Sequence, residues 1–415
     1  MTMRDKSRTD GWANALSGLG KLNVDKTRHN TFDGYEIFDD DFLSNAYDGD
    51  GLITKIVNVI PDDMTRAGWR ITNDDDNLIW NEMIKMGAAK AINKALKYAR
   101  LYRGSIIVMV TDRGRLEEPI PKGAKLQQLR VYSASRIEIS AINIIKDPNS
   151  IYFDDFDSFY IRTLSGDPFQ VHRSRCLVFK GELTSDSGNL DLQYRYWGFS
   201  TIQKIWERVS NLASTEQSVA NLMMELVIGK YSLSNLAAIL AQSTQEALTQ
   251  LYTRIEIINA SKSIINAVLL DKDEDYTRDS ANVSGMSDII DRIMMFVSTV
   301  SEIPVTRLFG RSPAGLNATG ESDERNYYDK VSSMQETILD AELKKLIGVI
   351  KGYISPNTLE ESDIIYNSLW EPTQKEKAEI DYIKAQTDAL YITNGVILPD
   401  EIMKQRFPDL DVLGD

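Results

Sequence analysis

Apolar residues recur at three- and four-residue spacing along several stretches of the chain, and each stretch predicts an amphipathic helix. The longest covers 200–229, where Ser200 is placed to cap its start and Gly229 to end it. A helix of that length extends roughly 45 Å. A second helical pattern lies at 244–260, after a polar segment at 230–243. We therefore predict two long antiparallel helices with a short tip; from periodicity alone, an ordinary hairpin inside a core is the stronger alternative.

The part of the chain before these helices mixes helical and strand patterns. Residues 1–50 are polar and predict an N-terminal arm that is partly disordered. From Gly51 a helix runs until Pro61, and Asp62 and Asp63 are interpreted as charges at the start of a further short helix. Another helix ends near 101. β-rich stretches between turns lie at 69–72, 105–111, 129–132, 137–139, 160–163, 171 and 176–179, so 51–198 predicts a mixed α/β unit.

The remaining part is divided at residue 370. Residues 263–370 predict a buried strand at 264–270, an acidic run at 271–279, a helix at 289–300, a long helix at 321–351 and a strand at 364–370. Residues 371–415 predict a polar helix that the capping box of Thr373 and Glu376 opens, and a short last helix that begins at Pro399.

A long connection joins the helices on either side of 302–328. Pro304 ends the preceding helix, and Gly310, Pro313, Gly315 and Gly320 then interrupt any regular structure. Long connections inside compact domains are often functional, although a plain surface loop is an equally good interpretation of the spacing.

This connection also carries a family resemblance. Its residues follow the pattern I-P-x-T-x-L-F-G-x-S-P-x-G-L-N-A-T-G-E-S-D, followed by NYYD and Gln335, and the pattern resembles a family of tailed-phage portal proteins. Weaker similarities to the family occur in DGWANALSGLG at 10–20, Arg103-Gly104, VHRSR at 171–175, YWGFS at 196–200 and NGVILPDE at 394–401.

The resemblance implies an α+β portal fold that assembles as a cyclic oligomer, with twelve subunits the usual number. It implies that 51–198 forms a wing, 199–262 the stem helices with a clip near 230–243, 263–370 further wing elements with a kinked helix and the Gly-rich loop, and 371–415 a helical crown. The implied location is the capsid vertex of the virion, after assembly in the host cytoplasm. The implied partners are the terminase large subunit, capsid and scaffolding proteins, a head–tail connector or adaptor, and double-stranded DNA bound without sequence preference.

Two sets of residues are candidates for the channel of such a ring. For the loop nearest DNA they are Arg307, Arg311, Gly315, Asn317, Thr319 and Gly320, because arginines can contact phosphates and glycines let the backbone approach. For the long helix that lines or supports the channel they are Gln203, Lys204, Glu207 and Glu216.

Composition agrees with passage of DNA better than with its retention. The 415 residues carry a formal net charge of −14, which disfavours tight, static binding to phosphates but permits DNA to slide past an acidic wall. Solubility alone explains the acidity equally well. No apolar run approaches the roughly 20 residues that a membrane span requires. The single cysteine, Cys176, excludes an internal disulfide.

Catalytic patterns are scarce, and we predict no enzyme activity, cofactor or metal. The phosphate-binding loop G-x-x-x-x-G-K-[ST] is absent, so nucleotide hydrolysis would belong to a separate motor. One enzymatic alternative comes from His29-Asn-Thr31 and His172-Arg-Ser174, which both fit the H-x-[ST] motif of two-histidine phosphoesterases. A helical adaptor that forms no ring is the third hypothesis.

Overall fold

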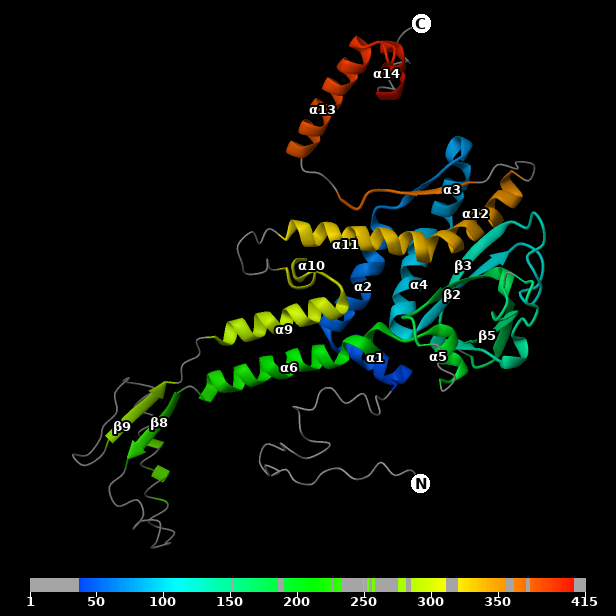
Figure 1. The fold of residues 1–415 in the computed structure, drawn as a ribbon. Helices are drawn as coiled ribbons and strands as arrows, with labels where there is room; N and C mark the ends of the chain where they lie inside the picture. Colours follow the sequence, from blue (N-terminus) through cyan, green and yellow to red (C-terminus); the bar gives the residue numbers. More distant parts are fainter. Residues whose placement is uncertain are drawn as a thin grey trace.

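Helices and small antiparallel sheets build the molecule, which confirms the predicted α+β class (Figure 1). The computed structural model describes residues 37–150, 152–163, 165–185, 190–225, 227–232, 275–280, 285–310, 320–355, 362–370 and 374–406, with a few helical residues between 249 and 257.

The first helices form the centre of the main core. They are α1 (Asp40–Gly49), α2 (Gly51–Arg66), α3 (Leu78–Lys85) and α4 (Ala88–Tyr102). Side chains of Asp39 and Asp50 accept hydrogen bonds from the first free N–H groups of α1 and α2, which fixes both starts. The predicted arm reached residue 50, whereas the structure forms α1 from residue 40 and buries its Leu43.

Pro61 does not end α2, contrary to the prediction. The helix continues to Arg66, and Asp63 lies in its last turn. A proline lacks the N–H that would bond to the carbonyl of Val57, four residues earlier. Arg100 of α4 supplies this bond instead, with Nε 3.1 Å from the Val57 oxygen and Nη2 3.2 Å from the Ile56 oxygen.

Two three-stranded antiparallel sheets follow α4. In the first, β2 (Gly104–Thr111) lies between β3 (Leu126–Ser133) and β7 (Cys176–Lys180); in the second, β5 (Ser158–Arg162) lies between β4 (Ile137–Glu138) and β6 (Pro168–His172). The strand β2 is buried on both faces. Its Ile107 and Met109 join the main core under α4, and its Ile106 and Val108 join a second core beneath the other sheet.

Short elements complete this unit. They are β1 (Trp69–Ile71), α5 (Leu192–Trp197) and the 3-10 turns η1 (Asp75–Asn77), η2 (Ala134–Arg136), η3 (Ala141–Asn143) and η4 (Arg173–Arg175).

The long helix pair differs from the prediction. Helix α6 (Thr201–Glu225) is followed by β8 (Val227–Ser232), so Gly229 lies in a strand and ends no helix. Strand β8 pairs with β9 (Asp275–Ser280), most of which lies in the acidic run 271–279, where no strand was predicted. The helix packed against α6 is α9 (Met286–Ser301), not 244–260, which lies almost entirely outside the described residues (Figure 1). The predicted tip 230–243 and strand 264–270 also lie largely outside them.

The chain then passes through α10 (Val305–Phe309) to one long helix with a π turn. This helix consists of α11 (Glu321–Met334), the π turn η5 (Gln335–Leu339) and α12 (Asp340–Ile354), which confirms the helix predicted at 321–351. At the π turn, buried Gln335 donates to the Met64 carbonyl at 2.7 Å, while its own carbonyl accepts from Tyr366. Strand β10 (Ile364–Tyr366) pairs with β1.

Two helices stand apart from the rest of the fold (Figure 1). Helix α13 (Gln374–Thr393) buries no residue, and α14 (Pro399–Arg406) begins at the predicted proline. Within the described part of the chain, no helix has both the length and the apolar character that a membrane span needs.

Candidate functional site

A buried carboxylate holds the start of the Gly-rich connection. Asp63 is fully buried and binds Arg307 of α10 through two contacts, Nη2 to Oδ1 at 2.6 Å and Nε to Oδ2 at 3.2 Å. The Tyr327 hydroxyl of α11 donates to the same carboxylate at 2.7 Å, and Arg66 Nε lies 3.2 Å away. These bonds raise the pKa of Arg307, and burial raises that of Tyr327. The cluster therefore joins α2, α10 and α11 through one charge.

The two ends of the connection also meet. Gly310, after α10, and Gly320, before α11, have φ angles of +70° and +69°, which glycine adopts without strain. A Cβ on Gly320 would lie 2.7 Å from Cγ2 of Thr306. Only glycine therefore fits at the point where α11 begins against α10.

The predicted loop residues divide into two groups. Arg307 and Gly320 are described, and both have structural partners within the chain. Arg311, Gly315, Asn317 and Thr319 lie outside the described residues, so their approach to DNA stays a prediction. Sequence reasoning missed Asp63, the partner of Arg307, because it assigned the acidic pair at 62–63 to a helix start.

The four candidates on α6 do not share one face. Gln203 accepts from the Phe38 backbone at 3.0 Å, and Lys204 pairs with Glu182 at 3.0 Å, so both contribute to the base of the helix. Glu207 and Glu216 are exposed. At 100° per residue, Glu207 lies about 40° and Glu216 about 220° around the helix from Gln203. A channel on one side of α6 can therefore be lined by Glu207 or by Glu216, but not by both.

Helix α9 displays an apolar stripe beside α6. Ile289, Phe296 and Val300 recur at intervals of seven and four residues and are 55%, 59% and 37% exposed. A groove of about 770 Å³ runs between this stripe and the serines of α6. Its lining includes Ser210, Ser214, Ser218, Ile289, Ile293 and Phe296. No described element covers Phe296, and its grouping with Ile289 and Val300 on one face of α9 makes an exposed apolar patch.

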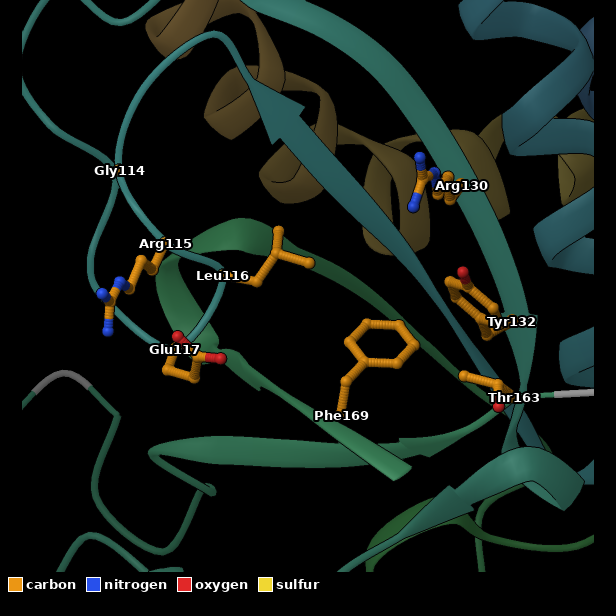
Figure 2. Close-up of a pocket in the computed structure, with 8 residues that line it drawn as sticks. All are labelled: Gly114, Arg115, Leu116, Glu117, Arg130, Tyr132, Thr163 and Phe169. Carbon is orange, nitrogen blue, oxygen red and sulfur yellow. The ribbon is translucent and has the colours of Figure 1, made fainter. Parts of the chain in front are cut away.

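The VHRSR segment organises the turn between β2 and β3. Arg175 is fully buried and donates to the Glu118 carbonyl at 2.6 Å and to the Thr111 hydroxyl at 2.7 Å. Beside this turn lies an open hollow of about 670 Å³ (Figure 2). In Figure 2, Leu116, Tyr132 and Phe169 point toward one another across it. Glu117 is the only carboxylate among its lining residues, so the hollow offers no acid–base pair.

A second charged cluster joins the sheets to α12. Arg173 binds Asp155 at 2.8 Å, and Lys345 Nζ donates to the carbonyls of Cys176 and Arg173 at 2.7 and 3.1 Å. Burial lowers the pKa of Lys345 to about 8 and raises that of the Cys176 thiol to about 12. Arg173 also approaches Glu342 of α12 at 3.9 Å, so the cluster fixes how the sheets sit on the long helix.

Neighbouring residues in the sequence hold the imidazole ring of His172 in place. Its Nδ1 accepts from the Ser174 backbone N–H at 3.1 Å, so the proton of the neutral ring resides on Nε2, which lies 3.6 Å from Asp157. Burial lowers the pKa of this imidazole. The Ser174 hydroxyl contacts Nδ1 at 2.9 Å and accepts from Ile120. His29 lies outside the described residues. Among the residues that are described, no three His, Cys, Asp or Glu side chains gather as metal ligands.

Comparison with known proteins decides the family. Residues 42–390 match the family described as "Phage portal protein". The chain belongs to the phage portal protein family. This match spans every element from α2 to α12, and the resemblance carried by the Gly-rich connection is thereby confirmed.

Relatives and solved structures extend this result. The chain is 29% identical to "Anti-CBASS protein Acb1" of Caulobacter sp. (strain RHG1), over 83% of this chain and 57% of that protein. It is 27% identical to a protein of the same name from Sphingomonas paeninsulae, over 96% of this chain and 65% of that one. The chain thus spans about three fifths of the length of these curated relatives. Its fold is similar to a chain in the "Neck of native GTA particle computed with C12 symmetry", with a TM-score of 0.55, 12% identity and coverage of 84% and 88%.

Proposed function

We propose that this portal protein assembles into a cyclic ring, with twelve subunits as the expected number, through which double-stranded DNA enters and leaves a phage capsid. The exposed stripe of Ile289, Phe296 and Val300 beside the α6–α9 groove carries the proposal. In a ring, each copy presents one surface to one neighbour and a different surface to the other. A second copy seated along the α9 stripe would remove these side chains from water.

The electrostatics of the chain suit movement of DNA. A ring of twelve chains with a net charge of −14 each repels phosphates overall, so DNA is not held tightly. Arg307 is engaged with Asp63, so this cation anchors the loop and does not form a free phosphate contact. The loop that it anchors, with Arg311, Gly315, Asn317 and Thr319, remains our candidate for the surface nearest DNA. Gln203 and Lys204 support the base of the stem.

The partners follow from the position of such a ring. We propose that it sits at the capsid vertex of the virion, after assembly in the host cytoplasm with capsid and scaffolding proteins. It would dock the terminase large subunit during packaging and a head–tail connector afterwards. Energy would come from that motor, because this sequence lacks a phosphate-binding loop.

A catalytic role is not part of this proposal. The curated relatives named anti-CBASS proteins are longer than the chain, which spans 57% and 65% of their lengths. His172 uses Nδ1 to cap the turn at Arg173, so its H-x-[ST] motif serves the local backbone. Hydrolysis of phosphodiesters by the purified chain, abolished by His172→Ala, would instead favour the two-histidine alternative.

The test measures assembly directly. The purified protein should form rings of about twelve copies, visible by negative-stain imaging and by native mass spectrometry. Phe296→Asp should shift most of the protein to monomers, because it places a charge in the contact. Ser287→Asp, exposed and about 180° around α9 from Phe296, is the matched control and should leave rings intact. A stable monomer of the unmodified protein across salt conditions would contradict the proposal.

A further inference from the structure

Helix α13 has two apolar faces that point in opposite directions. At 100° per residue, its apolar side chains fall into two arcs of about 80° and 100° whose centres are about 170° apart. The first, face A, consists of Ala378, Tyr382, Ala385, Ala389 and Ile392. The second, face B, consists of Ile380, Ile383, Leu390 and Tyr391; its arc also contains Thr387 and, one turn before Ile380, Glu376.

Neither face is covered in the single chain. The large apolar residues of both faces are between 38% and 65% exposed, and α13 buries none of its residues. Its Asp388 pairs with Arg406 of α14, but most of the stability of a helix in a protein comes from packing of its apolar face. An amphipathic helix that packs on one core needs only one apolar face. Two opposed faces indicate that α13 is enclosed between two partners.

We propose that α13 packs between the α13 helices of the two neighbouring copies, with face A of one copy against face B of the next. The proposal rests on the ring put forward above. Rotation about a ring axis places equivalent helices at the same height and makes every contact heterologous, so a helix that contacts its own copies on both sides needs two different complementary faces. The alanines of face A also leave room for the larger side chains of face B.

The charges at the edges of the faces complement one another in this arrangement. On one side of α13, Lys377 and Lys384 border face B, whereas Asp381 and Asp388 border face A. On the other side Glu379 borders face B, and its neighbour across the contact would be Lys375, which borders face A. Each edge therefore brings a cation of one copy beside an anion of the next.

These charges favour a second copy over other occupants. A membrane surface would bind one apolar face and leave the opposite face in water. An unrelated protein on each side would not require opposite charges at the matching edges of one helix. Asp388 already pairs with Arg406 of α14 at 3.1 Å, which orients its carboxylate at the edge of face A.

Cysteine cross-linking tests the contact. Ala378→Cys on face A and Ile380→Cys on face B lie on opposite sides of their own helix, so they cannot bond within one chain. In assembled rings, their sulfurs come within disulfide reach across the contact. Mild oxidation of the double variant should convert most of the monomer band on a denaturing, non-reducing gel into a ladder of oligomers. The native Cys176 is fully buried and does not contribute.

The two single variants are the controls and should remain monomeric on the same gel, because face A never meets face A. Dimers from either single variant would indicate a two-fold contact and overturn the proposal. Rings that form, as judged by mass photometry, while the double variant gives no ladder would overturn it and leave the proposed function standing. Failure of the unmodified chain to form rings would overturn both.

Discussion

Single buried polar side chains decide how the parts of this molecule meet. Asp63 joins three helices because its carboxylate is shared among Arg66, Arg307 and Tyr327. Lys345 joins α12 to the turn η4 and to the strand β7 through one backbone carbonyl of each. Both residues bind groups far away in the sequence, so each closes a long-range contact with one side chain. Removal of either leaves buried groups without partners, which costs more than the bond itself contributes.

Replacement of Asp63 measures the first of these clusters. Asp63→Asn keeps the volume but removes the charge that two guanidinium groups share, and should lower the free energy of unfolding by about 2–3 kcal/mol. The cost stays below that of a fully enclosed pair because Arg66 and Arg307 reach solvent. Urea denaturation gives the value. The control is Asp62→Asn, which removes the charge of a half-exposed partner of Lys97 and should cost less than about 1 kcal/mol. Equal losses of stability from the two substitutions would show that the buried cluster contributes no more than a surface ion pair.

The pH dependence of stability measures the second cluster. The pKa of Lys345 is lowered to about 8 from an ordinary 10.5, so between these values the unfolded chain binds more protons than the folded one. Lys345 should therefore contribute a rise of stability with pH across this window of at most about 3.4 kcal/mol, while the raised pKa of Cys176 opposes it above about pH 9, so its part is measured as the difference between the unmodified protein and the variant. Lys345→Met should abolish that rise relative to the unmodified protein. Lys344→Met, one residue earlier at an exposed amine that pairs with Asp340 and Asp363, should retain it, and identical pH profiles for all three would contradict the assignment.

Residue identity was easier to predict than residue role. The sequence placed Arg307 and Gly320 in a special connection, and both positions have a physical requirement in the structure. Arg307 was predicted to face DNA because its partner, Asp63, lies 244 residues away. No local sequence pattern predicts an ion pair between residues so far apart in the chain. The only signal was an acidic residue after a proline within an apolar helix, where exposed charge is the commoner interpretation.

At the scale of elements, α2 is held together by another helix. Pro61 removes one backbone donor, and Arg100 of α4 provides the hydrogen bond to Val57 in its place. The helix therefore tolerates its proline only while α4 is packed against it. This dependence makes the two residues energetically coupled although they belong to different helices.

A double-mutant cycle tests this coupling. Arg100→Met should destabilise the protein by about 1–3 kcal/mol, because it leaves the Val57 carbonyl without a donor. In the Pro61→Ala background the backbone supplies that donor, so the same substitution should cost about 1 kcal/mol less. Thermal or urea unfolding of the four proteins gives the coupling energy. Strictly additive costs would mean that Arg100 acts through its contacts with Ile56 and Glu182 instead.

Elements were predictable where local pattern and tertiary environment agree. The strand β2 is continuously apolar, and both of its faces are buried, so pattern and packing coincide. The strand β9 has the sequence DYTRDS, which looks irregular, yet pairing with β8 satisfies its backbone whatever its side chains are. The packing of α9 against α6 was missed because the β8–β9 pair was not predicted. Because the strand pair returns the chain at residue 280, α9 packs against α6, and periodicity carries no information about that return.

At the scale of the whole molecule, stability and assembly reside in different regions. The main core contains buried residues from helices α1, α2, α3, α4 and α6 and from the helix at 321–354. Helix α13 adds no buried residue to it. Family membership was evident from the 302–328 segment alone because that segment is specific in many positions. The surfaces that a ring would cover are the α9 stripe and the faces of α13, and their pairing could not be predicted from one chain.

This separation leads to a prediction about truncation. A chain that ends at Trp370 lacks α13 and α14, which bury no core side chain of the main unit, so its melting temperature as a monomer should stay within about 2 °C of the longer protein. Its rings should dissociate at a lower salt concentration or on greater dilution, because the contact between copies through α13 is gone while that along α9 remains. Calorimetry and mass photometry on the same preparations separate the two effects.

The double substitution Ile383→Glu and Leu390→Glu in the full chain provides the matched control. If face B contacts a neighbour, it should weaken the rings as the truncation does without changing the monomer. A large drop in melting temperature with unchanged rings would mean that α13 stabilises its own subunit and has no part in assembly.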